Sequence, residues 1–501
     1  MRDKKSLAVL SLSNQNMLEV RRAMAMDRRE FVQLGVAATL GAAADMHAAP
    51  KKRMNLLYVF SDQHRVQSLP GGDVNAVIAP NLDKFRRENF EMANCISNYP
   101  LCSPYRAILM SGRWPCQTGV VQNGPGLPAT EHGLGEQFRS NGYHTAYVGK
   151  WHLHHGGDHM FIPKGPERFG FEDWHMWCDT NAHYASWTYD QNTGERKQPH
   201  GYNATLMTDE AVEIIQKQKG AEKPWMMVVS WNPPHPPYNP PDVDRDQYNR
   251  DALKLRPNVK FIKDYIATKK PNFPVRDEAA LREAMQGYYG GITAIDLEFA
   301  RLLKALDETG QADNTIVIYT CDHGELMGSH GRIGKMMPHE ESCHVPFFIR
   351  IPGVTKKGGK SDTLFASIDM YPTLCGLAGV PVPAHCEGKD RSAAMHGHKV
   401  DGAEHVFLMS NTGGARTAES DLPDYRGLRT ATHTYAVMTD GRWCLYDNEK
   451  DPFQTNNLVR DPKYKAMMDK FDVALQGWIN HTKDPFPLKQ AVTKVNHSWF
   501  A

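Results

Sequence analysis

Four short hydrophobic runs recur along the middle of the chain, and each ends in side chains that ionise or bind metals. The runs are MNLLYVFSDQH, HTAYVGKWHLHH, PWMMVVSWNPPHPPY and NTIVIYTCDHGE, and they end near Asp62, Lys150, His235 and Asp322. Their length and their β-branched and aromatic content predict buried strands. Because ligands bind outside the carboxyl ends of strands in an open α/β sheet, we expect these ends to form one site.

Amphipathic stretches such as HGLGEQFRSNG and ITAIDLEFARLLKALDETG lie between the hydrophobic runs. This alternation predicts an α/β domain with a central, mostly parallel sheet flanked by helices. The helix predicted in SIDMYPTLCGLAGVPVP ends at glycines and then turns through prolines, which indicates a domain boundary near residue 385. We expect a large domain over residues 51–385 and a small α+β subdomain over 386–501, with a hairpin turn at Thr439-Asp440-Gly441.

The N-terminal segment predicts export. Arg28 and Arg29 precede a mildly apolar stretch over 32–44 and small residues at Ala48-Ala49, which is the layout of a twin-arginine signal. The apolar stretch is shorter than the ~20 residues that cross a bilayer. We therefore set residues 1–50 apart from the fold, expect no membrane span in the mature chain, and predict a periplasmic or secreted protein.

Composition narrows the classes of function. The 501 residues carry a formal net charge of +1 and are 41% hydrophobic, which is typical of a packed globular protein. So small a net charge gives no electrostatic reason to expect nucleic acid or an anionic membrane as a partner. Nine cysteines without a CxxC pair argue against a structural zinc site or a dithiol redox motif, and their odd number leaves at least one thiol unpaired.

The candidate for that thiol is Cys102. We expect a strand over 90–96 and a helix after it, with Ser103 as N-cap and Pro104 in the first turn. Cys102 would then lie at a helix N-terminus, which favours an anion. The spacing fits neither a tyrosine-phosphatase loop, which needs an arginine where Ile108 stands, nor a phosphate loop or a G-x-S-x-G elbow. A thiol hydrolase leaves the metal-type residues unexplained, and a buried structural cysteine remains an alternative.

The segment CSPYRAILMSGR resembles the signature of the type I sulfatases. The matching positions are Cys102, Pro104, Arg106, Leu109, Ser111, Gly112 and Arg113. VFSDQ, GKWHL, NPPHPPY, CDHGE, GRIGKMMPHEES and LYDNEKDPFQTNNL also occur in the family's order, from about residue 54 to about 460. The resemblance implies an alkaline-phosphatase-like fold, hydrolysis of sulfate esters, and oxidation of Cys102 to formylglycine by a maturase.

The resemblance also implies a cation site and a set of catalytic residues. The cation ligands would be Asp62, Gln63, Asp322 and His323, completed by an oxygen of the modified Cys102. Many sulfatases carry Asp and Asn where this chain has Gln63 and His323. Calcium is the cation that the family implies, and the imidazole shifts the preference toward manganese or zinc. The catalytic set would be Cys102, Arg106, Lys150, His152, His235 and Lys335.

Each member of the catalytic set has an expected role. Arg106 would hold the hydrated aldehyde and the negative charge of the site. Lys150 and His152, two apart at a strand end, would point the same way and bind the aldehyde hydroxyl and sulfate. His235 and Lys335 are both candidates to protonate the leaving alcohol, and the sequence does not choose between them.

A sulfated carbohydrate is the expected substrate of this chemistry. A phosphonate monoester or phosphodiester hydrolase on the same scaffold is one alternative, and a glycan-binding relative with unmodified Cys102 is another. Residues 155–200 and 239–278, the latter interpreted as an insertion near the mouth of the site, would supply substrate contacts. We interpret the flanking His64, Arg65, His154 and His155 as bystanders. Three tryptophans are expected to pack or to present one ring to a sugar. They are Trp174, Trp177 and Trp187.

Overall fold

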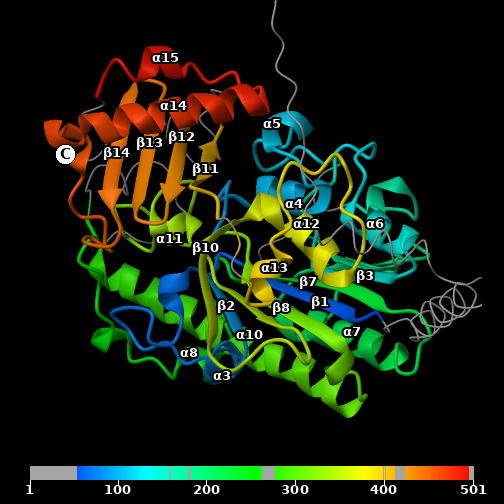
Figure 1. Ribbon diagram of the computed structural model, residues 1–501. Coiled ribbons are helices and arrows are strands. Elements are labelled where there is room, and N and C mark those ends of the chain that lie inside the picture. The colour runs from blue at the N-terminus through cyan, green and yellow to red at the C-terminus, as the bar shows by residue number, and fades with distance from the viewer. Residues whose placement is uncertain are drawn as a thin grey trace, which may run out of the picture. The chain divides into compact units, whose positions relative to one another are not determined.

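The computed structural model describes residues 53–156, 160–178, 182–261, 277–398, 400, 402–411 and 424–495. The proposed export signal lies outside these residues. Arg53–Ala501 form one compact unit, built around a ten-stranded sheet (Figure 1). From one edge to the other the sheet consists of β10 (Gly359–Ala366), β2 (Phe90–Ile96), β9 (Phe347–Arg350), β8 (Thr315–Cys321), β1 (Asn55–Asp62), β7 (Trp225–Pro234), β3 (His144–Lys150), β4 (Asp173–Trp177), β5 (Thr188–Tyr189) and β6 (Arg196–Lys197).

The centre of the sheet is parallel. β8, β1, β7, β3 and β4 run the same way, and so do β10 and β2, whereas β9 is antiparallel to both of its neighbours. The four hydrophobic runs of the sequence form β1, β3, β7 and β8, which are adjacent in the sheet. The predicted α/β class with a central, mostly parallel sheet is therefore confirmed.

Helices cover both faces of the sheet because alternate side chains of each central strand point to opposite sides. Leu57 and Val59 of β1 belong to the core under one helical layer, and Leu56, Tyr58 and Phe60 belong to the core under the other. The first layer contains α3 (Pro80–Glu88), α7 (Asn203–Lys217) and α10 (Glu278–Glu308). The second contains α4 (Cys102–Ser111), α6 (Leu134–Ser140) and α12 (Ser367–Ala378).

The small C-terminal sheet has four antiparallel strands (Figure 1). They are β11 (His405–Ser410), β12 (Tyr425–Thr430), β13 (His433–Met438) and β14 (Gly441–Asp447). The predicted turn at 439–441 joins β13 to β14. α14 (Lys465–Thr482) contributes Leu475 and Ile479 to the same core as this sheet. Short helices complete the described part: α5 (Pro115–Thr118), α8 (Asp242–Arg245), α11 (Glu340–Cys343), α13 (Ser392–Met395) and α15 (Leu488–Ala491). The boundary near residue 385 stays a prediction.

Candidate active site

The carboxyl ends of four adjacent strands bring polar side chains to one edge of the sheet. Asp62 is the last residue of β1 and Lys150 the last residue of β3. Asp322 follows β8, and His235 follows β7. Because these strands are parallel neighbours, their ends lie together, which is where open α/β sheets bind ligands.

Cys102 is the first residue of α4, and the helix is capped by Leu101 rather than by the predicted Ser103. Ser103 is the second residue of the helix rather than its cap, and its hydroxyl donates to the carbonyl of His152 at 2.8 Å. The backbone N–H of Ser103 donates to the side-chain oxygen of Asn123 at 3.1 Å. Cys102 nevertheless lies at a helix N-terminus, where the helix dipole favours negative charge.

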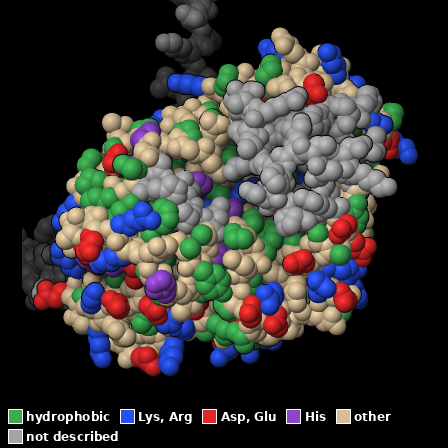
Figure 2. All heavy atoms as spheres, turned by 180° about the vertical axis from the view of Figure 1, so that it is seen from behind, with side chains coloured by type: hydrophobic (Ala, Val, Ile, Leu, Met, Phe, Trp, Pro, Cys, Tyr) green, Lys and Arg blue, Asp and Glu red, His purple; other side chains and the backbone are tan. Residues whose placement is uncertain are grey.

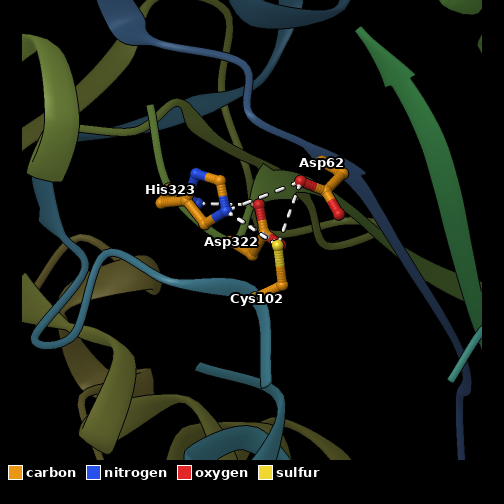
Figure 3. Close-up of side chains that lie close together, drawn as sticks. All are labelled: Asp62, Cys102, Asp322 and His323. Carbon is orange, nitrogen blue, oxygen red and sulfur yellow. Dashed lines mark hydrogen bonds and ion pairs between the residues drawn. The ribbon is translucent and has the colours of Figure 1, made fainter. Parts of the chain in front are cut away.

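Four buried side chains converge around one point (Figure 3). The Sγ atom of Cys102 lies 3.3 Å from Nε2 of His323 and 3.7 Å from Oδ1 of Asp62. The same Nε2 lies 3.5 Å from Oδ1 of Asp62 and 3.6 Å from Oδ2 of Asp322. One ligand-type atom from each residue falls within 4.8 Å of the other three, and none of the four residues is more than 1% exposed.

The imidazole of His323 is oriented by its neighbour. Its Nδ1 lies 3.0 Å from the carbonyl oxygen of Gly324. Because a carbonyl only accepts, Nδ1 carries the proton and Nε2 turns its lone pair toward Asp62 and Asp322. Burial is the main cause that lowers the pKa of His323, so the ring is neutral. A neutral ring held through its other nitrogen is the arrangement typical of histidines that bind metals.

Gln63 is held so that its amide oxygen faces the cluster. Its side-chain amide donates to Oε2 of Glu325, which leaves Oε1 at 2.8 Å from Nζ of Lys335. Glu325 is itself fixed by the hydroxyl of Tyr238 at 3.0 Å and by two backbone N–H groups of its own loop. The backbone N–H of Gln63 donates to Oδ1 of Asp322 at 3.0 Å. The amide therefore cannot flip without leaving Glu325 facing an oxygen.

Lys335 and His235 differ in what they offer to the cluster. Nζ of Lys335 lies 3.2 Å from Sγ of Cys102. Nδ1 of His235 lies 2.6 Å from the carbonyl oxygen of Pro236, so this nitrogen carries the proton. Burial, followed by the charge of Lys335, holds the pKa of His235 well below its usual range. Lys335 thus presents donor hydrogens, and the second nitrogen of His235 presents a lone pair.

Arg106 connects the strand ends. Its Nη1 donates to the carbonyl of Lys150 at 2.6 Å and to the hydroxyl of Ser230 at 2.7 Å. Its Nη2 lies 3.3 Å from Oδ2 of Asp62 and 3.6 Å from Oδ2 of Asp322. The planar guanidinium makes these contacts with two of its nitrogens at once, which an ammonium group cannot do. Arg106 is 1% exposed, so solvent screens its charge toward both carboxylates less than it would at the surface.

Asp62 stays ionised despite its burial. Burial alone would raise the pKa of Asp62, but the surrounding groups outweigh it, and Lys150 is the largest of them. Nζ of Lys150 donates to Oδ2 of Asp62 at 2.8 Å. The net result is a pKa well below the usual range of a carboxyl group.

The face of the molecule in Figure 2 carries a depression with histidine and basic side chains along its margin.

His152 lies beyond the end of β3. β3 ends at Lys150, and the backbone of His152 has a left-handed φ of 60°. The alternation of side chains that applies within a strand therefore does not extend to His152, and the inference that it points the same way as Lys150 stays a prediction. Its carbonyl accepts the hydrogen bond of Ser103 at the start of α4.

The residues of the cluster fit a divalent cation. Two carboxylates, an amide oxygen and a neutral imidazole nitrogen form a donor set that suits calcium or manganese. Within the described residues, Oδ2 of Asp322 is buried and accepts no hydrogen bond. The guanidinium of Arg106 lies 3.6 Å from this oxygen and makes no hydrogen bond to it, so a cation bound at this point would supply the closer partner that a buried carboxylate oxygen requires.

Comparisons with known proteins agree with this chemistry. The family model described as sulfatase matches residues 54–380, and the model of the N-sulphoglucosamine sulphohydrolase C-terminal region matches residues 328–481. The chain belongs to the sulfatase family. It is 34% identical over 437 residues to an ulvan-active sulfatase of Formosa agariphila, a match that covers 86% of this chain and 82% of the relative. The family membership identifies the protein as an enzyme that hydrolyses sulfate esters.

Two further relatives are similar over most of their length. An N-acetylglucosamine-6-O-sulfatase of Bacteroides thetaiotaomicron is 24% identical, and the match covers 90% of each chain. A solved structure from work on glycosaminoglycan metabolism by Bacteroides thetaiotaomicron has a TM-score of 0.77 and 27% identity, and covers 88% of this chain and 98% of its own. The fold and the family thus agree along nearly the whole described part of the sulfatase.

Sequence reasoning missed three residues that support the site. Glu325 orients Gln63 by accepting a hydrogen bond from its amide. Ser230 accepts a hydrogen bond from Arg106, and Asn123 accepts one from the backbone N–H of Ser103 in α4. Glu325 was visible as the last residue of the CDHGE segment, directly after the predicted ligands. Ser230 and Asn123 carry no local signal, because their partners are remote in sequence.

Most flanking residues take part in packing. His64 and Arg65 are buried, and they bond to the hydroxyl of Tyr319 and the carbonyl of Glu325. His154 is half-buried and His155 exposed. Of the three tryptophans, Trp174 and Trp177 are buried in the core, and Trp187 is half-buried with the guanidinium of Arg196 3.9 Å above its ring. In the described part of the chain, no helix combines the length and apolar character of a membrane span.

Proposed function

We propose that this sulfatase removes sulfate from a sulfated carbohydrate through a formylglycine made from Cys102. The observation that carries the proposal is the convergence of Cys102 with Asp62, Asp322 and His323 within 4.8 Å. A thiol is a poor nucleophile toward a sulfate ester and a poor fit to two carboxylates. An oxygen nucleophile at the same position suits both the ester and a hard cation.

Hydrated formylglycine would supply two hydroxyl groups, one to attack sulfur and one to expel sulfate afterwards as the aldehyde forms again, and the cation would supply positive charge to the sulfate oxygens. We assign calcium as the cation, with manganese as the alternative, and its ligands as Asp62, Gln63, Asp322 and His323. Gln63 keeps its oxygen toward this point because Glu325 holds its amide nitrogen.

We assign Lys335, rather than His235, as the proton donor for the leaving alcohol. Lys335 carries donor hydrogens 3.2 Å from the reactive position. His235 is neutral, and its one proton is bound to the carbonyl of Pro236, so it accepts rather than donates in this state. Arg106 and Lys150 hold Asp62 in its ionised form.

The first experiment is the mass of the tryptic peptide that spans residues 88–106. It holds both Cys95 and Cys102, so fragmentation separates the modified position from an internal control. We expect Cys102, after expression with a maturase, to have lost one sulfur and two hydrogens and gained one oxygen, and Cys95 to be unchanged. An unmodified Cys102 together with no sulfate release would favour the glycan-binding alternative.

The second experiment compares substrates side by side. The panel contains 4-nitrophenyl sulfate, N-acetylglucosamine 6-O-sulfate, galactose 4-O-sulfate and a phosphonate monoester. We expect a sulfated sugar to be hydrolysed with the highest kcat/KM. Preference for the phosphonate monoester would support the alternative hydrolase.

We also infer that the protein is exported through its twin-arginine segment. Arg28 and Arg29 support this inference, because paired arginines before an apolar stretch are the recognised feature of such signals. Replacement of both by lysine should retain the protein in the cytoplasm, and cell fractionation measures this directly.

A further inference from the structure

Three buried side chains at the carboxyl edge of the sheet have polar atoms without a partner. His183 is 2% exposed, and Asn203 and Asn232 are each 1% exposed. Neither ring nitrogen of His183 and neither amide atom of the two asparagines has a hydrogen-bond partner among the described residues. Because buried polar groups in native proteins are almost always satisfied, six such atoms require partners that the described chain does not supply.

The topology places all three next to the end of β3. His183 lies between β4 and β5, and β4 pairs with β3 so that Trp177 is opposite Lys150. Asn232 is on β7, the neighbour of β3 on its other side, and its carbonyl accepts from the backbone of His235 at 3.1 Å. The unpartnered groups therefore flank the strand that delivers Lys150 to the catalytic cluster.

Asn203 joins this group through the start of α7. Its backbone N–H donates to the carbonyl of His183 at 2.8 Å. α7 ends at residue 217 and β7 begins at 225, so the helix runs back along the sheet and begins at the carboxyl edge. The ring of Tyr202, the preceding residue, lies edge-on to that of His183, with 5.9 Å between centroids.

The charges around His183 agree with this placement. Burial lowers the pKa of His183 to about 3, and the charges that act on it are those of Lys150 and Asp62. The same two charges act on His235. The imidazole is therefore neutral, with one donor nitrogen and one acceptor nitrogen.

The chemistry of the three side chains defines the ligand. A neutral imidazole and two amides offer both donors and acceptors, and none carries a charge. Hydroxyl groups, which also donate and accept, match such a set, whereas a second sulfate or a carboxylate would need a cation. We propose that His183, Asn203 and Asn232 bind the neutral hydroxyl groups of the sugar ring whose sulfate ester is cleaved at Cys102. This proposal rests on the proposed function, and it makes these side chains determinants of sugar specificity.

The test compares a sugar sulfate with an ester that has no sugar hydroxyls. His183→Ala, Asn203→Ala and Asn232→Ala are each measured with 4-nitrophenyl sulfate and with the best-cleaved sugar sulfate of the panel above. Loss of hydrogen bonds to substrate hydroxyls should lower kcat/KM for the sugar about 10-fold to 100-fold. It should change kcat/KM for the aryl ester by less than about 2-fold. His183→Gln, which keeps a donor and an acceptor, should recover part of the loss.

The outcomes separate the inference from the proposed function. A wild type that cleaves no sulfate ester contradicts the proposed function. A wild type that cleaves only the aryl ester overturns the sugar site and leaves sulfatase chemistry in place. Equal losses on both substrates, or no loss on either, would show that the three residues only bind water inside the fold.

A binding measurement covers variants with poor turnover. In the Cys102→Ser background, calorimetry measures affinity for the sugar sulfate and for inorganic sulfate. Addition of His183→Ala should weaken the affinity for the sugar sulfate about 10-fold or more and leave the affinity for inorganic sulfate unchanged. Equal weakening of both ligands overturns the proposal.

Discussion

The side-chain amide of Gln63 donates to the carboxylate of Glu325, and this bond decides which atom of Gln63 faces the proposed cation site. Glu325→Gln removes the carboxylate that accepts from Gln63. Because partners behind metal ligands typically contribute 10-fold to 100-fold in affinity, we expect the cation concentration for half-maximal activity to rise by about that factor. Titration of chelated enzyme with calcium and with manganese measures it.

The matched control for this substitution is Glu278→Gln at the exposed start of α10, which should leave the titration unchanged. An unaltered cation requirement in Glu325→Gln would show that Gln63 keeps its orientation without this carboxylate.

Cys102→Ala should abolish turnover and leave the fold intact. The side chain is small, and its removal takes away the reactive position while Asp62, Arg106 and Lys150 still neutralise one another. Sulfate release measures activity, and thermal unfolding measures the fold.

Cys95→Ala is the control, because Cys95 is equally buried and lies on β2 away from the cluster. This variant should stay active with a somewhat lower Tm. Full activity in Cys102→Ala would refute the mechanism.

Arg106→Lys should lower kcat/KM about 100-fold or more. The substitution keeps a positive charge beside Asp62 but loses the second nitrogen, so the contacts to Ser230 and to the carbonyl of Lys150 cannot all be kept. Steady-state kinetics with 4-nitrophenyl sulfate measures the change. Arg86→Lys, in a partly exposed pair with Asp83, should have no effect. If Arg106→Lys retains wild-type kcat/KM, the site needs only the charge.

Glu340 should make stability depend on pH. Burial would raise its pKa, but Arg429 and His344 lower it below the usual range. A lowered folded-state pKa stabilises the protein above the unfolded value of about 4.3, and this contribution is lost as the pH falls below it. The destabilisation caused by Glu340→Gln should therefore shrink by about 1–2 kcal/mol between pH 7 and pH 3.

Urea denaturation at both pH values measures this difference. Glu213→Gln, in an exposed pair with Lys217, is the matched control. It should change the free energy of unfolding only slightly at either pH. If Glu340→Gln lowers the free energy of unfolding equally at pH 7 and pH 3, the ion pair of Glu340 with Arg429 does not have the assigned role.

The sequence by itself determined the strands that carry the site. Buried parallel strands have a continuous apolar pattern, and the residue that ends each one is read directly from the chain, as at Asp62 and Lys150. The helix at Cys102 was equally local, although its N-cap is Leu101 rather than Ser103.

Only the tertiary structure decided which atoms meet. Gln63 and Glu325 are 262 positions apart, and no local pattern pairs them. Strand alternation cannot place the side chain of His152, because β3 ends at Lys150 and the backbone has a left-handed φ at His152. No sequence pattern singles out His183, Asn203 or Asn232. The structure does so, because it buries their polar atoms without hydrogen-bond partners among the described residues. Periodicity records the burial of each position along one element, whereas hydrogen bonds between elements depend on how those elements pack.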